Sequence, residues 1–184
     1  MVHIKESHNL LDAHQTTEMK KVIIESRFSA PDTEGLVRNK KFTIACMRDC
    51  FQRMEAPYAS HVIYAQSHVL DDFVAHERAI GMHAGFLWGD LGEMTVVYTD
   101  LGISSGMKAG IDHAIAMGRK VEYRELGFIP TVSPREIELE DENIKNQKEL
   151  FEIIKNEILP DKKLCLSNVV SNPNASDVKV SKKM

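Results

Sequence analysis

A loop rich in glycine and serine, residues 100–107, connects the strongest predicted strand directly to a predicted helix. Glycines allow a tight turn and a close approach of the backbone to a ligand. The free N–H groups and positive dipole end of the helix would favour a phosphate or another anion, and Asp100 could accept hydrogen bonds from a sugar hydroxyl. In the alternative interpretation the serine only caps the helix. The residues that we expect to contact a ligand here are Gly102, Ser104, Ser105, Gly106 and Met107.

The loop after the first predicted strand supplies an arginine, an aromatic ring and backbone donors. Arg27 could meet a phosphate and Phe28 could stack on a base, with Ser26 beside them. In the alternative interpretation Phe28 belongs to the core and Arg27 is solvated. His61 is a further candidate, although histidines in sheets are more often structural than catalytic.

Acidic residues follow the second predicted strand. Asp71 and Asp72 end the loop, and Glu77 and Arg78 lie in the first turns of the helix that starts at Asp72. Paired carboxylates near one cleft can act as general acid or base, or bind ribose hydroxyls. The structural alternatives are that Asp72 caps the helix and that Glu77 and Arg78 face solvent or form an ion pair. Asp72, Glu77 and Asp100 are the candidate catalytic carboxylates.

Composition and the remaining motifs exclude several classes of protein. The 184 residues carry a net charge of −4, which does not suit a nucleic-acid-binding protein. No apolar run approaches the ~20 residues of a membrane span, and no secretory signal is visible. Three cysteines fit a reducing cytoplasm, and Cys46 and Cys50 lie on one helix face as small apolar residues. No histidine or cysteine spacing indicates a metal, no Gly-x-Ser-x-Gly elbow is present, and we expect no cofactor.

Short apolar, β-branched segments alternate with helical periodicity between residues 20 and 159. This alternation predicts an α/β fold of the Rossmann-like, flavodoxin-like type: a three-layer sandwich with a four- to five-stranded parallel sheet. Ligands bind such sheets beyond the carboxyl ends of the strands, where the strand order reverses. The predicted strands are Lys21–Glu25, Ser60–Ala65, Glu93–Thr99 and Lys120–Arg124, and the predicted helices between them are Glu34–Met54, Asp72–Trp88 and Met107–Met117.

An additional C-terminal helix is predicted over Pro134–Leu159. Ser133 and Glu136 match a capping box, and proline occupies the first helical position. This helix could cover the sheet or pair with another subunit. Residues 1–19 are expected to form a flexible arm and residues 160–184 a disordered tail, because both are too polar to bury a core.

These segments resemble the nucleoside 2-deoxyribosyltransferase superfamily, and more closely a phage and bacterial branch of it that has no assigned function. The resemblance covers roughly residues 21–126, and its most specific element is the Asp-x-Gly-x-Ser-x-Gly-Met string of residues 100–107. The other matching segments are residues 22–31, 56–66, 70–72, 77–81, 97–99, Ala114 and Gly118.

The resemblance implies a homo-oligomer whose pocket takes a small nucleoside or nucleotide. The cysteines and the composition lead us to expect a cytoplasmic protein with no nucleic acid or membrane as partner. It also implies cleavage of the bond between base and sugar, in which a carboxylate attacks the anomeric carbon. In catalytic members a glutamate stands early in the helix after the Gly/Ser loop, and here that position is Gly110. Asp112 is about 200° further round the helix and should point elsewhere.

Two functions from different classes therefore remain open. The first is an enzyme acting at the N-glycosidic bond of a nucleoside or nucleoside 5′-monophosphate, as a deoxyribosyltransferase or an N-glycosidase. Another carboxylate would then replace the missing glutamate. The second is a protein that binds a nucleotide without turnover, to sense or sequester it. The glycine at position 110 motivates the second hypothesis, and the ligand-binding loops motivate both.

Overall fold

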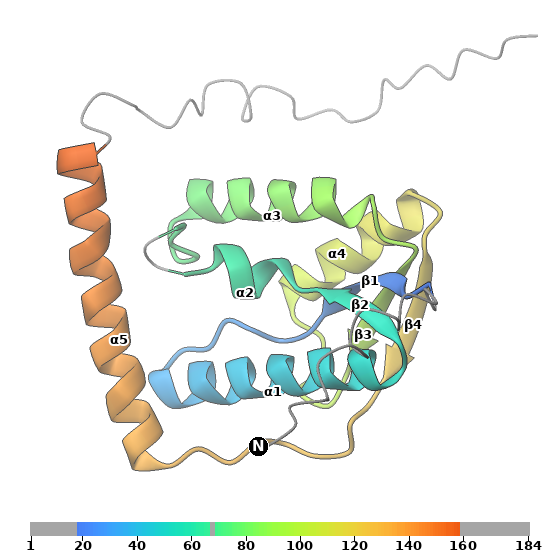
Figure 1. The fold of residues 1–184 in the computed structure, drawn as a ribbon, viewed down its shortest axis with the longest axis horizontal. Helices are drawn as coiled ribbons and strands as arrows, with labels where there is room; N and C mark the ends of the chain where they lie inside the picture. The colour runs from blue at the N-terminus through green and yellow to red at the C-terminus, as the bar shows by residue number, and fades with distance from the viewer. Residues whose placement is uncertain (1–17, 67–68, 159–184) are drawn as a thin grey trace, which may run out of the picture.

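The computed structural model describes residues 18–66 and 69–158, which form a parallel β-sheet with helices on both sides (Figure 1). The predicted α/β, Rossmann-like three-layer class is confirmed. The four strands have the order β2-β1-β3-β4. The second strand lies on one side of β1 and the third on the other, so the strand order reverses between β1 and β3. The strands are β1 (Lys20–Glu25), β2 (Glu55–Tyr58), β3 (Met94–Tyr98) and β4 (Lys120–Arg124).

Five α-helices accompany the sheet, and the last continues into one π-helical segment. They are α1 (Thr33–Gln52), α2 (Ser60–Tyr64), α3 (Ala75–Gly89), α4 (Ser105–Ala116) and α5 (Pro134–Ile153), followed by η1 (Ile154–Ile158). Within residues 18–66 and 69–158, no helix is both long and apolar enough to cross a membrane. The expected arm and tail lie almost entirely outside the described residues.

The alternation of side chains along β1 divides its residues between the two layers of helices. Val22 and Ile24 are fully or almost fully buried in the core cluster that contains Cys46 and Cys50 of α1. Ile23 and Glu25 point to the opposite face, where α3 and α4 lie. Cys46 and Cys50 thus have the structural role expected of them, and both are free thiols.

The prediction of a strand over Ser60–Ala65 is wrong. Those residues form α2, and the strand is the preceding segment, β2, which pairs only with β1 at the edge of the sheet. An edge strand tolerates Pro57, whose missing N–H would be costly in a central strand. The short helix packs on α3 because Gly85 has no side chain: a Cβ there would lie 2.8 Å from Ser60 Oγ. Tertiary packing therefore overrides the strand preference of Val62 and Ile63.

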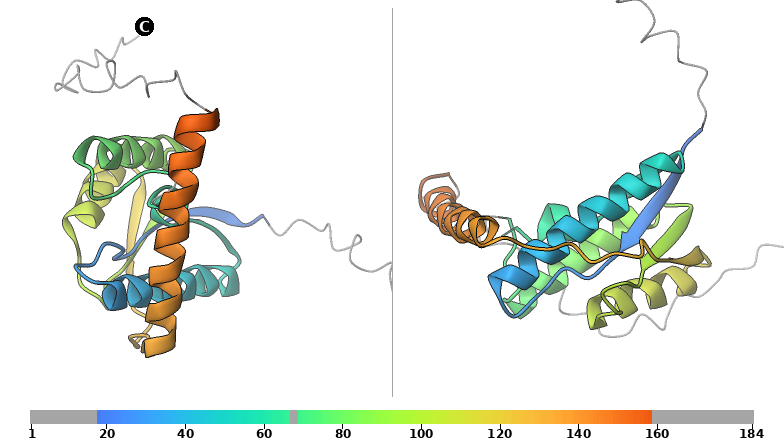
Figure 2. Two further views of the ribbon diagram at one scale, coloured as in Figure 1. Left: turned by 90° about the vertical axis from the view of Figure 1, so that its left-hand side faces the viewer. Right: turned by 90° about the horizontal axis from the view of Figure 1, so that it is seen from below.

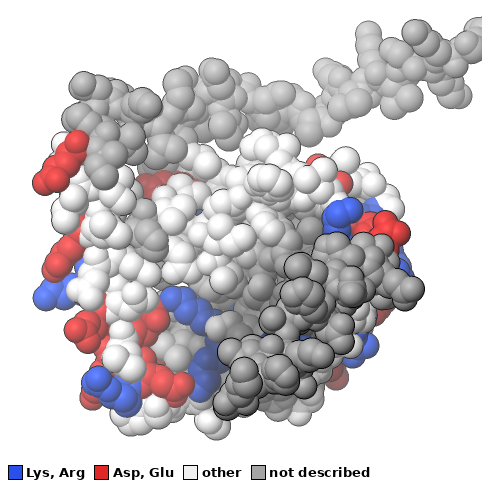
Figure 3. Space-filling view, in the orientation of Figure 1, with Lys and Arg blue, Asp and Glu red and all other residues white. Residues whose placement is uncertain are grey.

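Helix α5 begins as predicted, with Ser133 and Glu136 forming a capping box. It lies against α1, where Lys40 forms an ion pair with Glu140 at 2.5 Å and Thr33 donates a hydrogen bond to Asp141 (Figure 2). Acidic and basic side chains crowd this contact in Figure 3. No residue of α5 is buried, so charged contacts rather than a shared core hold the helix to α1.

Candidate active site

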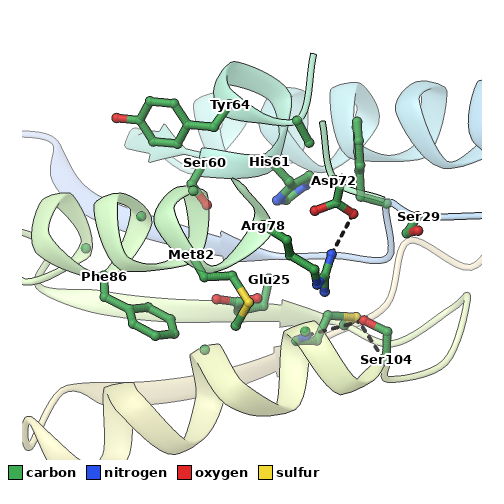
Figure 4. Close-up of a pocket in the computed structure, with 18 of the residues that line it drawn as sticks. Glu25, Ser29, Ser60, His61, Tyr64, Asp72, Arg78, Met82, Phe86 and Ser104 are labelled. Atoms are coloured by element: carbon green, nitrogen blue, oxygen red, sulfur yellow. Dashed lines mark hydrogen bonds and ion pairs between the residues drawn. The ribbon is translucent and has the colours of Figure 1, made fainter. Parts of the chain in front are cut away.

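One pocket opens at the carboxyl edge of the sheet, beside the point between β1 and β3 where the strand order reverses (Figure 4). Its walls come from the loop after β1, from α2, from the inner face of α3 and from the first turns of α4. This is the location that the strand-end rule predicts. Nine of the residues expected from the sequence line it: Ser26, Phe28, His61, Asp72, Glu77, Arg78, Ser104, Gly106 and Met107.

An anion-binding corner forms where Arg78 of α3 meets the N-terminal turn of α4. The Arg78 guanidinium is held by Asp72, with Nη1 2.5 Å from Oδ2, and a Cβ on Gly106 would lie 2.9 Å from Nη2. Because Gly106 has no side chain, the Arg78 guanidinium can occupy this space. Ser104 caps the helix by accepting from Met107 N at 3.3 Å, and its side chain also faces the pocket. A cation and a helix N-terminus together favour an anionic group at this corner.

Glu25 is the acidic residue of the pocket wall that was not predicted from the sequence. It is the last residue of β1, and its carboxyl group lies between α3 and α4 (Figure 4). A Cβ on Gly110 would overlap Glu25 Oε1 and stand 2.5 Å from Glu25 Cδ, so the carboxyl group rests directly on the bare backbone of α4. Burial raises the pKa of Glu25 to about 8, while the positive charge of Arg119 acts in the opposite direction.

Two rings and a hydroxyl pair form the wall beside the loop after β1. The Phe28 and His61 rings have centroids 5.2 Å apart, and His61 Nε2 lies 3.1 Å from Ser26 Oγ. Ser26 Oγ is also within 2.8 Å of Thr43 Oγ1 on α1. Burial lowers the pKa of His61 to about 4, so its ring is neutral at pH 7. Phe28 is buried, as its structural interpretation requires, and it also borders the pocket.

We expect the neutral His61 to make the protein sensitive to acid. The unfolded chain takes up the histidine proton near pH 6.5 and the folded one only near pH 4, so the contribution of His61 to stability falls as pH decreases between those values. The loss is about 1.4 kcal/mol for each pH unit in that range. Chemical denaturation of the wild type and of His61→Gln from pH 7 to pH 4 measures this contribution, because the stability of the variant relative to the wild type should rise as the pH decreases. The same replacement at exposed His83 is the control, and equal slopes for the two variants would contradict the assignment.

Asp72 and Glu77, the two predicted acids that line the pocket, both have structural partners. Glu77 Oε2 accepts the backbone N–H of Asp71 at 2.7 Å, and Asp72 pairs with Arg78. Asp72 does not cap α3, because the N-cap position is Val74. Arg78 therefore forms a structural ion pair, as one alternative predicted, but its partner is Asp72. Both side chains also border the pocket.

Five residues expected in the site lie outside the pocket wall: Arg27, Asp71, Asp100, Gly102 and Ser105. Asp100 accepts hydrogen bonds from the backbone of Leu126 and Gly127, at 3.0 and 2.8 Å, and so fixes the loop after β4. Arg27 donates to the Leu101 carbonyl at 3.0 Å, which ties the loops after β1 and β3 together. Gly102 has a φ of +74°, and Ser105 is an exposed residue at the start of α4.

A second, smaller hollow adjoins the pocket on the side of α5. It shares Phe28, Asp72 and Leu70 with the pocket and includes Asp71, and Ile144 of α5 is among the residues that line it. Helix α5 therefore lines a hollow next to the pocket in addition to contacting α1.

The described part of the chain offers no metal centre, since it contains no group of three or more His, Cys, Asp or Glu side chains able to hold an ion. Asp112 is exposed on α4, as its helical position predicts, while Gly110 is buried. The polar side chains that line the pocket beside the N-terminus of α4 are Glu25, Asp72, Glu77, Arg78, Arg119, His61, Tyr64 and four serines.

Comparison with known proteins identifies a family but no characterised relative. The family model described as a domain of unknown function, DUF7768, matches residues 20–124, which is more than half of the chain, so the protein belongs to that family. No curated protein and no solved structure matches the chain significantly. The match spans the sheet from β1 to β4 and leaves out α5.

Proposed function

We propose that this member of the DUF7768 family binds a nucleoside or a nucleoside 5′-monophosphate and cleaves its N-glycosidic bond. The observation that carries the proposal is the joint presence, in one pocket, of an anion-binding corner and a carboxyl group whose pKa is about 8. The first suits a phosphate or a 5′-hydroxyl, and the second suits acid catalysis near neutral pH.

The reaction requires groups of this kind. Positive charge develops on the sugar as the bond to the base breaks, and the departing base needs a proton. Glu25, Asp72 and Glu77 are the carboxyl groups of the pocket wall. With the phosphate at Arg78 and the N-terminus of α4, the sugar spans the pocket and the base packs against Phe28.

Incubating the purified protein with a panel of nucleosides and 5′-monophosphates, followed by chromatography for free base, tests the proposal. We expect release of at least one base, with a pH dependence described in the Discussion. Absence of base release across the panel and from pH 5 to pH 9 would overturn the enzymatic function.

The second function, binding without turnover, is favoured by one observation: α4 presents no carboxylate at Gly110. Calorimetric titration would then show binding of a nucleotide, and the ligand would be recovered intact. Recovery of cleaved ligand would exclude this alternative.

Arg78 should contribute mainly to the affinity for phosphate. We expect Arg78→Gln to weaken binding of a nucleoside 5′-monophosphate by about 10- to 100-fold, the value of one charged hydrogen-bonding partner, and to change nucleoside binding much less. Calorimetry with both ligands measures the difference. Arg135→Gln, which removes the same charge from the exposed face of α5, is the control. An equal loss for nucleoside and monophosphate would contradict the anion corner.

Assembly into a homo-oligomer, which the resemblance implies, belongs to the same proposal, as does the cytoplasmic location expected from the cysteines. Leu87, Trp88 and Leu91 lie near the end of α3 and are all more than half exposed, which provides apolar surface for a second copy. Light scattering of wild type and Trp88→Ser measures the oligomeric state, and a strictly monomeric wild type would contradict the assembly.

A further inference from the structure

We propose that Glu25 is the catalytic carboxylate of this pocket, and that β1 presents it in the space that a side chain at position 110 of α4 would otherwise fill. This inference rests on the proposed function and assigns its acid catalyst. It places the reacting carboxyl group on a strand end, in a chain whose α4 offers only a glycine at the facing position.

The position of the Glu25 side chain depends on the absence of a side chain at Gly110. Gly110 is buried in the interior of α4, where glycine destabilises a helix relative to alanine, so its presence needs a local reason. The reason is the close approach of Glu25: a Cβ on Gly110 would stand 2.5 Å from Glu25 Cδ and 2.9 Å from Oε2. Real Cβ atoms do not come this close, so Glu25 can occupy its position only opposite a glycine.

Glu25 also differs from the other acids in its bonding. Asp72 pairs with Arg78, Glu77 accepts the Asp71 N–H, and Asp100 accepts two N–H groups of the loop after β4. Among the described residues, none donates a hydrogen bond to the Glu25 carboxyl group. Its oxygens thus remain available to a ligand in the pocket.

Burial, and not a neighbouring charge, favours the protonated form of Glu25. Arg119, which precedes β4, is the cation that opposes its protonation, and that guanidinium already donates to Thr95 Oγ1 and to the Gly89 carbonyl. Across the pocket stand the Asp72–Arg78 pair, Glu77 of α3 and the neutral His61 of α2. With a pKa near 8, Glu25 carries a proton at pH 7 that it can donate.

The reaction balances with Glu25 as the single acid and base. Glu25 donates its proton to the leaving nitrogen of the base while the bond from that nitrogen to the anomeric carbon breaks, and the electron pair of the bond goes to the base. The ionised carboxylate then faces the positively charged sugar. Water adds to the anomeric carbon and returns a proton to Glu25, which gives free sugar, free base and the original enzyme.

Glu25→Gln tests the assignment with little change of shape. We expect kcat for base release to fall by about 10²- to 10⁴-fold, the usual contribution of a general acid. Asp112→Asn, an exposed acid two residues from Gly110 on the same helix, is the matched control and should keep wild-type activity. Thermal unfolding of both variants verifies that they are folded.

A paired substitution, Glu25→Ala with Gly110→Asp, tests the equivalence of the two positions. The first change vacates the space, and the second places a carboxyl carbon about 1.5 Å beyond the Cβ on α4, close to the place that Glu25 Cδ held. We expect the double variant to recover at least tenfold over Glu25→Ala alone. The control is Gly110→Asp alone, which should be inactive because both carboxyl groups then compete for one space.

The outcomes separate the inference from the function on which it rests. Wild-type activity together with full activity of Glu25→Gln would overturn the assignment of Glu25 and leave the proposed function standing. A wild-type protein that releases no base would overturn the proposed function, and the assignment with it. A double variant no more active than Glu25→Ala would contradict the equivalence of positions 25 and 110.

Discussion

Gly110→Ala is expected to remove at least 99% of the base-releasing activity while leaving the protein folded. The added Cβ would stand 2.5 Å from Glu25 Cδ, so the carboxyl group must leave its present position. A displacement of about 1 Å in a reacting group commonly costs 10²-fold in rate. Stability should change little, because alanine gains up to about 1 kcal/mol over glycine in a helix interior and overpacking costs about 1–3 kcal/mol.

The measurement pairs base release with thermal unfolding of the same preparation. Asp112→Ala is the matched control, because it introduces the same residue at an exposed position of α4. Full activity of Gly110→Ala would contradict the account, since it would mean that the close contact between Glu25 and α4 does not matter for the reaction. If the variant does not fold at the first temperature, the same two readouts are taken at a lower temperature at which it does.

The pKa of Glu25 predicts the second large effect: stability falls as the pH rises towards 8, and activity falls above pH 8. Because the protonated carboxyl group is the acid, kcat/KM should fall about tenfold per pH unit above pH 8. For stability the sign is the following: between pH 4.5 and pH 8 the unfolded chain has released the Glu25 proton and the folded protein has not. The contribution of Glu25 to stability therefore falls with rising pH across that range, by about 1.4 kcal/mol per unit, and levels off above pH 8.

Glu25→Gln removes this titration, so its stability should exceed that of the wild type most at pH 8 to 9. Urea unfolding of both proteins at pH 5, 7 and 9 measures the difference, which should grow with pH. Glu93→Gln is the control, because Glu93 is an acid at the other end of the sheet that accepts the Lys21 N–H at 2.8 Å. A wild-type curve parallel to that of Glu25→Gln would contradict a buried, protonated Glu25.

Much of the fold could be predicted because local patterns and packing agree along most of the chain. The run of five buried residues in β3 has the composition and length of a central parallel strand. The capping box of Ser133 and Glu136 marks the start of α5 in the sequence itself. Residues 60–64 were predicted wrongly because their helix depends on Gly85 of α3, a contact that no local pattern contains.

The location of the site followed from the topology, whereas the orientation of individual side chains did not. Ser104 and Arg78 reach the pocket because they start helices at the carboxyl edge of the sheet. Asp100 stands at the same edge, yet its carboxylate turns to the backbone of Leu126 and Gly127. That choice depends on a loop 26 residues away in the sequence, so strand-end position alone could not reveal it.

Glu25 was missed because an acid at the end of a strand is ordinarily a solvated residue. Two signals were present in the sequence: a glutamate directly after the apolar residues 22–24, and a glycine in the interior of a predicted helix. Each is common alone. Only the structure shows that the two residues face each other so closely that a Cβ added at Gly110 would lie 2.5 Å from Glu25 Cδ.

A crystal structure of Glu25→Gln soaked with a nucleoside 5′-monophosphate tests the central claim most directly, because the variant should bind the ligand without cleaving it. The account predicts the phosphate at Arg78 and the N-terminal turn of α4, and the anomeric carbon beside the residue 25 side chain. A nucleotide bound elsewhere on the molecule, or one that turns its anomeric carbon away from residue 25, would contradict it.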